Sequence, residues 1–509
     1  MKIYVFAVGG TGARVLRSFT MLMAAGCKLP EDTTIVPVIL DYDLLNGNFQ
    51  TTEGVLEKYQ NVRESAYKMK DTYHLYKDDS FFAAPIIRLD QIPVSGGASP
   101  LRQRTFHVSI EGEKDTFGKY IGYDLLTRGH DEHSDLSLTK DFLNVLYNND
   151  PESHGRELHL QLNVGFKGNP NIGAVVFDKW IESEEFRVFE QSVGQDDRIF
   201  VVSSIFGGTG AAGFPKIIQR LRQPGYDSVQ KAKIGAAIVM PYFKFGDDRD
   251  SAISASIFNS KTKAALNYYN SCRLNDSLDA IYYLSDFVDQ ADGMYKNVEG
   301  GQEQKNAAHV VELLAATAIV DFANKENFKG RRAFEFGLKE DLANVINISH
   351  FAERTKERYL NDLTKFTFFM QFYERILPNV RDKDVYNVKL DIKSQLAKKN
   401  DDTVFHTKLS NFFGEYRQWL KELKENTMRK FEPYRVEDSD PINELLSHKK
   451  LGKKGPFGLG TTPLRDDFFH EKMNIGYKTH CETITDNESI FLRISRDTMS
   501  CALDFANKY

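Results

Sequence analysis

The sequence alternates short apolar runs with glycine-rich loops and helices, and this repeated unit restricts the fold more than any other feature. Residues 2–8 form an apolar run that ends in glycines, and 13–25 follow with the spacing of a helix. Residues 198–205 and 233–239 are further apolar runs, and the first of them leads into FGGTGAAGFP at 206–215. Continuous apolar strands joined by helices are typical of a parallel sheet that is buried on both faces. The pattern therefore predicts an α/β fold with a mostly parallel sheet.

Three further runs and one helix complete the expected core. Residues 34–40, 158–164 and 279–284 are apolar and of strand length. Residues 303–324 carry apolar side chains on almost every side, which predicts a long helix buried in the centre of the domain. We therefore expect helices on both faces of the sheet.

The character of the sequence changes outside these runs. Residues 51–155 are polar and rich in loop signals, whereas 339–430 show helical spacing with many charged and aromatic residues, and a glycine-rich stretch at 451–463 interrupts the final part. We expect a discontinuous core domain formed by residues 1–50 and 156–330. We expect 51–155 to be a large insertion and 331–509 to be a mainly helical C-terminal domain.

Composition argues against several classes of function. The 509 residues carry 66 basic and 71 acidic side chains, and the net charge of −5 gives no general attraction to nucleic acid. Four scattered cysteines form no CxxC pair, so they fit a reducing compartment and a cytoplasmic location better than a disulfide framework. The sequence contains no run of about 18 uncharged apolar residues, so no transmembrane segment is expected.

Three glycine-rich loops are expected at one edge of the sheet. They occupy residues 9–14, 165–170 and 206–213, and each joins an apolar run to a helix. Backbone N–H groups at the N-terminus of a helix form a natural binding site for phosphate. One such loop is equally compatible with a plain tight turn, but the carboxyl ends of parallel strands share one edge. Three loops at that edge predict a phosphate-binding site.

Two carboxylates follow the second strand at the same edge. Asp41 and Asp43 are two residues apart, so their side chains share one side of an extended chain. Carboxylate oxygens beside a phosphate are natural ligands for a hydrated Mg²⁺. The pair predicts a magnesium site, and the alternative on spacing alone is that the two residues cap a loop.

A dinucleotide-binding fold is the main rival on the residues alone. Gly10 and Gly12 follow the first strand, and an acidic residue at the end of the second strand matches a ribose contact. Val15 stands where the third glycine of that fingerprint is expected, and a dinucleotide fold does not need a further loop at 206–213. Neither GxxxxGKS nor GxxxxGKT is present, which disfavours a P-loop enzyme.

The ordered motifs resemble those of the tubulin/FtsZ superfamily over residues 1–50 and about 158–324. FGGTGAAGFP at 206–215 resembles the signature loop GGGTGSG, AVGGTGARV at 7–15 is similar to the family's first glycine loop, and GFKGNPNIG at 165–173 resembles the FtsZ loop GAGGNPEIG. The resemblance implies that a nucleotide is held by Gly9, Gly10, Thr11, Gly12, Ala13, Arg14, Gly165, Gly168, Asn169, Pro170, Phe206, Gly207, Gly208, Thr209, Gly210 and Ala211.

The same resemblance assigns the base side of the site. IVMPYFKFG at 238–246 is similar to the FtsZ segment VVTKPFNFEG, which places Pro241 near the nucleotide. Ser285 stands where the family has an asparagine that contacts the base. The N-terminal part of the central helix recognises guanine in the family, and the candidates here are Asn306 and His309. GTP or GDP is the implied ligand, with Mg²⁺ organised by the acidic pair.

Hydrolysis in this family is completed by a neighbouring subunit, which supplies an acidic loop that follows the central helix. The NxDxxD pattern of that loop is absent from 325–342, so no catalytic residue is assigned. The first expectation is a self-assembling, filament-forming GTPase, with other protein partners at the C-terminal helical region. The alternatives are a nucleotide-gated, non-hydrolysing module of a bacterial membrane-remodelling or conflict system, and a dinucleotide-dependent enzyme.

Overall fold

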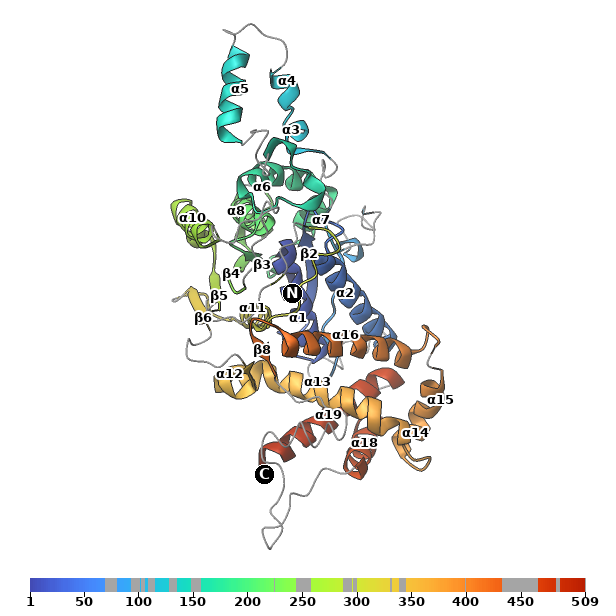
Figure 1. Ribbon diagram of the computed structural model, residues 1–509. Coiled ribbons are helices and arrows are strands. Elements are labelled where there is room, and N and C mark those ends of the chain that lie inside the picture. The colour runs from blue at the N-terminus through green and yellow to red at the C-terminus, as the bar shows by residue number, and fades with distance from the viewer. Residues whose placement is uncertain are drawn as a thin grey trace.

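A six-stranded parallel sheet forms the centre of the computed structural model (Figure 1). The structure describes residues 1–68, 80–92, 101, 106–108, 115–127, 135–147, 157–223, 225–243, 258–286, 295, 300–329, 332–337, 345–398, 400–432, 466–481 and 486–508. The strands are β1 (Lys2–Val8), β2 (Thr34–Leu40), β3 (Arg198–Ser204), β4 (Lys233–Val239), β5 (Ala280–Ser285) and β6 (Ala333–Gly337), in the order β2-β1-β3-β4-β5-β6. The expected α/β class with a parallel sheet is confirmed.

Helices connect these strands and pack around the sheet. They are α1 (Gly9–Ala24), α2 (Gly47–Ala66), α6 (Pro170–Val176), α7 (Glu184–Ser192), α8 (Gly208–Arg222), α9 (Asp227–Lys231), α10 (Phe258–Ser271) and α11 (Val310–Ala323). Single 3-10 turns or short 3-10 helices lie at Leu89–Gln91, Glu157–His159, Leu162–Val164, Phe177–Glu182 and Leu274–Ser277. α1 and α11 lie against each other and against the sheet, and α2 packs on α1. None of the described helices is both long and apolar enough to cross a bilayer.

Both faces of the sheet are covered, as the continuous apolar strands predict. Val5 of β1 pairs with Phe200 of β3, so Phe6 and Phe200 point to opposite faces. Phe6 packs edge to face on Phe189 of α7, and Phe200 packs on Phe322 of α11. Six of the seven residues in each of β1, β2, β3 and β4 are buried, which explains why these strands carry no polar alternation.

Residues 51–155 contribute both to the core and to a projection. Most of α2 falls in this range, and it packs on α1 and on α16 (Phe405–Glu425). By contrast, α3 (Phe117–Tyr120), α4 (Tyr123–Thr127) and α5 (Asp135–Leu146) stand away from the sheet at one end of the molecule (Figure 1).

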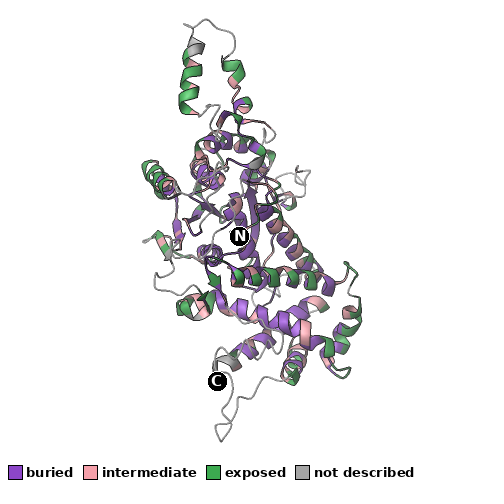
Figure 2. Cartoon of the chain, in the orientation of Figure 1, coloured by how far each residue is buried: buried purple, intermediate pink, exposed green. Residues whose placement is uncertain are grey.

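The described part of the chain from 345 onward is mainly helical. Its elements are β7 (Val345–Ile346), a 3-10 turn at Ile348–His350, α12 (Glu353–Thr355), π-helical turns at Lys356–Leu360 and Phe372–Ile376, α13 (Asn361–Gln371), a 3-10 turn at Leu377–Asn379, α14 (Val385–Leu390), α15 (Ile392–Ala397), α16, β8 (Lys430–Phe431), α18 (Asp466–His480) and α19 (Asn487–Lys508). Phe366 and Phe369 of α13 pack against Phe413 of α16, and α13 also packs on α19. These contacts form the buried band that Figure 2 shows in purple along α13.

Two expected elements differ from the structure. The strand expected at 158–164 is wrong, because Glu157–His159 and Leu162–Val164 are 3-10 turns. The positions beside β1 and β2 are already taken, since β1 lies between β2 and β3 and the outer edge of β2 meets Ile86 and His107. The central helix begins at Val310 instead of 303.

The later start of the central helix has a local cause. The backbone N–H of Val311 donates to Nδ1 of His309 at 3.1 Å, and the backbone N–H of His309 donates to Glu312 at 3.0 Å. This capping box fixes the start of α11. It leaves 300–308 as a non-helical segment, and part of that segment lies against the start of α2.

Candidate functional site

The order of the strands places a crevice beside the end of β1. The chain runs from β1 to β2 on one side and later places β3 on the other side of β1, so connections leave β1 and β3 in opposite directions. Ligands of open α/β sheets bind at such switch points, outside the carboxyl ends of the strands. A cavity of about 890 Å³ that is open to solvent lies there.

The glycine loops meet in this cavity because glycine permits their close approach. A Cβ atom on Gly9, whose φ is +71°, would lie 3.3 Å from the backbone nitrogen of Gly210. A Cβ atom on Gly208 would lie 2.9 Å from the backbone nitrogen of Gly168. Side chains at these positions would push the loops apart. The first and third loops therefore touch each other, and the third also touches the second.

Two helices begin at the cavity without side-chain caps. α1 has 16 residues and α8 has 15, and neither has an acidic residue in its first turn. Neither N-cap residue, Val8 or Gly207, contributes a side-chain hydrogen bond to the first turn. The first backbone N–H groups and the positive ends of both helix dipoles are thus available to an anion.

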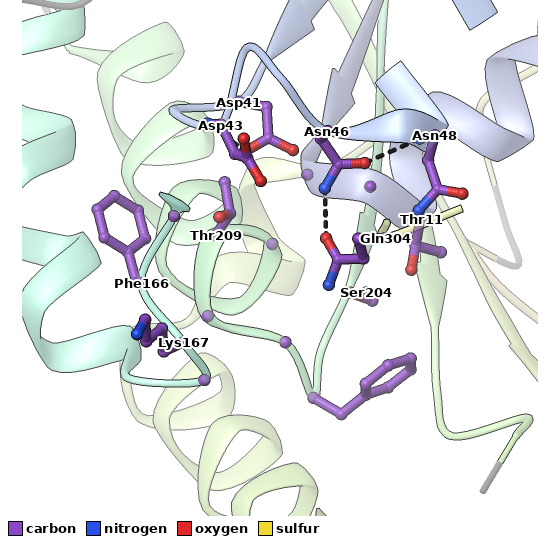
Figure 3. Close-up of a pocket in the computed structure, with 18 of the residues that line it drawn as sticks. Thr11, Asp41, Asp43, Asn46, Asn48, Phe166, Lys167, Ser204, Thr209 and Gln304 are labelled. Carbon is purple, nitrogen blue, oxygen red and sulfur yellow. Dashed lines mark hydrogen bonds between the residues drawn. The ribbon is translucent and has the colours of Figure 1, made fainter. Parts of the chain in front are cut away.

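The two carboxylates lie together on the wall of the cavity (Figure 3). The backbone N–H of Asp43 donates to Asp41 at 3.2 Å, and the N–H of Gly301 donates to Oδ2 of Asp43 at 2.6 Å. Burial raises the pKa of Asp41 to about 7 and also raises the pKa of Asp43. The other oxygen of Asp43, Oδ1, is buried and has no hydrogen-bond partner.

This donor set fits a hydrated magnesium ion. Burial that disfavours a carboxylate is relieved by a cation, and the unpartnered Oδ1 of Asp43 offers a ligand atom. In the described part of the chain, no group of three or more His, Cys, Asp and Glu side chains is arranged to hold a metal. A magnesium ion here would take its remaining ligands from water and from phosphate, as it usually does.

A group of side-chain amides lines the opposite wall from the second loop. Asn46 donates to Gln304, and its Oδ1 accepts the backbone N–H of Asn48 at 3.0 Å. The Oδ1 of Asn48 accepts the backbone N–H of Asn306 at 2.9 Å. Figure 3 shows Asn46, Asn48 and Gln304 on the side of the cavity away from Lys167. Amides that both donate and accept suit a heterocyclic base or a ribose.

Arg14 lines the cavity but is committed to the protein. Its Nε lies 2.6 Å from Oε1 of Glu312, and its guanidinium also donates to the hydroxyl of Tyr242. Burial opposes the charged form, but Tyr242 and Glu312 together raise the pKa of Arg14 above its ordinary value. Arg14 therefore joins α1 to α11 at the base of the site.

The structure brings most of the predicted site residues together. Those that line the cavity are Gly9, Gly10, Thr11, Arg14, Asp41, Asp43, Gly165, Gly168, Phe206, Gly207, Gly208, Thr209, Gly210 and Asn306. Those that do not line it are Gly12, Ala13, Asn169, Pro170, Ala211, Pro241, Ser285 and His309. Gly12 instead packs on β1, where an added Cβ would lie 2.7 Å from the carbonyl carbon of Ala7.

His309 is buried and caps α11 away from the cavity. Its burial, followed by the charges of Arg429 and Arg14, lowers its pKa to about 3. The ring is therefore neutral at ordinary pH, with Nδ1 accepting from Val311. Asn306 lines the cavity, whereas His309 serves the structure of the helix.

Several cavity residues were missed by sequence reasoning. They are Asn46, Asn48, Ser204, Phe243, Lys261 and Gln304, while Phe166 and Lys167 lie within the predicted second loop but were not singled out. Asn46 and Asn48 follow the acidic pair at the same strand end, so the signal that found the carboxylates applies to them too. Lys261 on α10 has no such signal, because only the fold brings it to the second loop.

Comparison with known proteins adds no family to this geometry. No protein-family model matches the chain, and no curated protein is significantly similar to it. The function of the cavity is therefore inferred from its residues.

Proposed function

We propose that the chain is a tubulin/FtsZ-like protein that binds GTP with Mg²⁺ in the cavity at the ends of β1 and β3. The observation that carries the proposal is the meeting of three glycine loops and two buried carboxylates at one switch point of a parallel sheet. Phosphate oxygens would accept hydrogen bonds from the backbone N–H groups at the starts of α1 and α8, and the hydroxyl group of Thr209 would donate a further one. Asp41 and Asp43 would organise the metal.

The sequence of groups along the cavity supports one orientation of the ligand. The amides of Asn46, Asn48 and Gln304 lie toward one end, and Lys167 lies at the other (Figure 3). A base and ribose suit the amides, whereas a chain of phosphates suits the glycine loops and the lysine end. The guanine preference itself comes from the motif resemblance.

A dinucleotide fold is less well supported. The common dinucleotide order 3-2-1-4-5-6 has two strands beyond β1, whereas the described sheet has β2 alone on that side. The glycine loop after β3 is also unexplained by a dinucleotide. NAD(P) binding without GTP binding would nevertheless establish that alternative.

Self-assembly with hydrolysis between subunits is the first extension of the proposal, and a non-hydrolysing module is the second. The two differ in turnover. An assembling GTPase hydrolyses GTP at a rate per subunit that rises with protein concentration, whereas the module binds GTP without turnover. Both outcomes keep the nucleotide site.

The first experiment identifies the natural ligand. Protein purified without added nucleotide is denatured, and any released nucleotide is identified by chromatography and mass spectrometry, followed by calorimetric titration with GTP and Mg²⁺. GTP or GDP should be released, or GTP should bind with a Kd below about 1 mM. Absence of any guanine nucleotide binding would overturn the proposal.

A pair of glycine variants ties binding to this cavity. Gly10→Ala places a methyl group in the cavity, where the nearest atom is Nδ2 of Asn48 at 3.5 Å, so the fold tolerates it. GTP affinity should fall about tenfold or more because the methyl group occupies ligand space. Gly54→Ala on α2 is the control, since nothing lies within 4 Å of its added Cβ. Equal affinities for the two variants would place the ligand elsewhere.

A further inference from the structure

We propose that Lys261 makes this site selective for a nucleoside triphosphate over a diphosphate by contacting the terminal phosphate. The inference rests on the proposed nucleotide function and adds a specificity-determining residue to it. Lys261 belongs to α10, outside every motif that points to the site.

Lys261 is held at the end of the cavity that the second glycine loop, 165–170, forms. Its Nζ donates to the carbonyl oxygen of Gly168 at 2.7 Å, and it lines the cavity with Gly165 and Gly168 of the second loop. A Cβ atom on Gly168 would lie 3.4 Å from this Nζ, so the ammonium group is close to the loop backbone. Lys167 of the same loop lies at the end of the cavity away from the amide of Asn48 (Figure 3).

The surroundings of Lys261 leave its charge poorly balanced. Its side chain is half-buried, and burial lowers its pKa despite the opposing charge of Glu157. Within the described residues, its hydrogen bond goes to a neutral carbonyl oxygen. A phosphate oxygen would be a stronger partner, because a hydrogen bond between two charged groups is about twice as strong as a neutral one.

The position of Lys261 explains why it would contact the third phosphate of a triphosphate. The third glycine loop touches the second loop at Gly168, where Lys261 is bound. The contacts run in order from Asn48 beside Gly10, through Gly9 beside Gly210, to Gly208 beside Gly168. A ligand whose base lies at the amides would therefore reach Gly168 with its last phosphate. A diphosphate ends one group earlier and leaves Lys261 on the carbonyl oxygen.

The test compares two ligands on matched variants. Affinities for GTPγS and GDP are measured with Mg²⁺ by calorimetry for the wild type, Lys261→Met, Lys261→Arg and Lys263→Met. Lys263 lies on the same helix and is exposed, so it is the control. Lys261→Met should reduce the preference for GTPγS over GDP about tenfold or more, with GDP affinity changed less than about twofold. Lys261→Arg should keep most of the preference, and Lys263→Met should keep all of it.

The outcomes distinguish failure of the proposed role of Lys261 from failure of the proposed nucleotide function. Parallel losses for both ligands in Lys261→Met, or an unchanged ratio, would overturn the role of Lys261. Failure of the wild type to bind either ligand would overturn the proposed function instead. If Lys261→Met does not fold, Lys261→Gln makes the same comparison, and an unchanged ratio of the two affinities there would overturn the role of Lys261.

Discussion

At the scale of single residues, Asp43 offers an unpartnered carboxylate oxygen to a ligand in the cavity. Gly301 donates to one of its oxygens at 2.6 Å, while the other is buried without a partner. Such an unsatisfied buried group costs roughly 1–3 kcal/mol. A magnesium ion or one of its water ligands would remove that cost by contacting the oxygen. Binding of the metal should therefore also stabilise the fold.

Asp43→Asn should therefore separate the metal from the nucleotide. The amide oxygen can still accept from Gly301, but the negative charge is lost. GTP affinity with Mg²⁺ should fall about tenfold, whereas affinity in EDTA should change less than about twofold. Titrations in both buffers check this, with the exposed Asp178→Asn as control. Equal losses with and without Mg²⁺ would show that Asp43 does not act through a metal.

At the scale of elements, the segment 300–308 joins the cavity to the C-terminal helices. Its Gln304 and Asn306 line the cavity. At its other end, the backbone N–H of Ala308 donates to Glu422 of α16 at 3.0 Å, and Asn426 donates to the carbonyl oxygen of Ala308 at 3.0 Å. A non-helical segment is thus held in place by hydrogen bonds from both sides.

Asn426→Ala should weaken both stability and binding. The amide of Asn426 also donates to Tyr295, and its oxygen accepts from the backbone N–H of Met428. Its removal leaves buried polar groups unpaired and should lower the free energy of unfolding by about 1–3 kcal/mol. GTP affinity should fall as well, because the segment that carries Gln304 is less fixed. Urea unfolding and calorimetry measure the two effects.

The control for this variant lies on the same helix. Lys421→Ala removes an exposed side chain of α16, and its stability should change by less than about 0.5 kcal/mol. If Asn426→Ala loses stability but keeps full GTP affinity, the segment 300–308 does not depend on α16 for its position.

At the scale of the whole molecule, local sequence patterns predicted the strands and glycine loops of the sheet better than the segments that pack around them. β1, β2, β3 and β4 were found because strands buried on both faces are continuous apolar runs. The glycine loops were found because close backbone contacts demand glycine. The alternating run at 158–164 misled, because a run joins a sheet only where the fold brings it to a free strand edge, which no local pattern states. Lys261 could not be found for a similar reason, since its contact with Gly168 spans 93 positions.

Two buried histidines, one beside the sheet and one in the helical region, make the stability of the folded chain depend on pH. Burial lowers the pKa of His309, beside the sheet, and of His406, on α16, to about 3 each. Both rings are neutral in the folded chain, whereas the unfolded chain binds protons near pH 6.5. The stability that they contribute is complete above pH 6.5 and is lost as the pH falls toward 3. The ion pair of Arg17 with Glu422 joins α1 to α16, so we expect one cooperative transition.

Between pH 6 and 4 the two histidines together should lower the free energy of unfolding by about 2.7 kcal/mol per pH unit. His406→Phe should roughly halve this histidine contribution. The phenylalanine ring can still pack on Tyr373, and the hydroxyl of Tyr373 keeps its hydrogen bond to the backbone carbonyl oxygen of residue 406. Urea unfolding of wild type and variant at pH 7, 6, 5 and 4 gives the slopes. An unchanged slope would mean that His406 is protonated in the folded chain, and two separate transitions would mean that the helical region unfolds independently of the sheet.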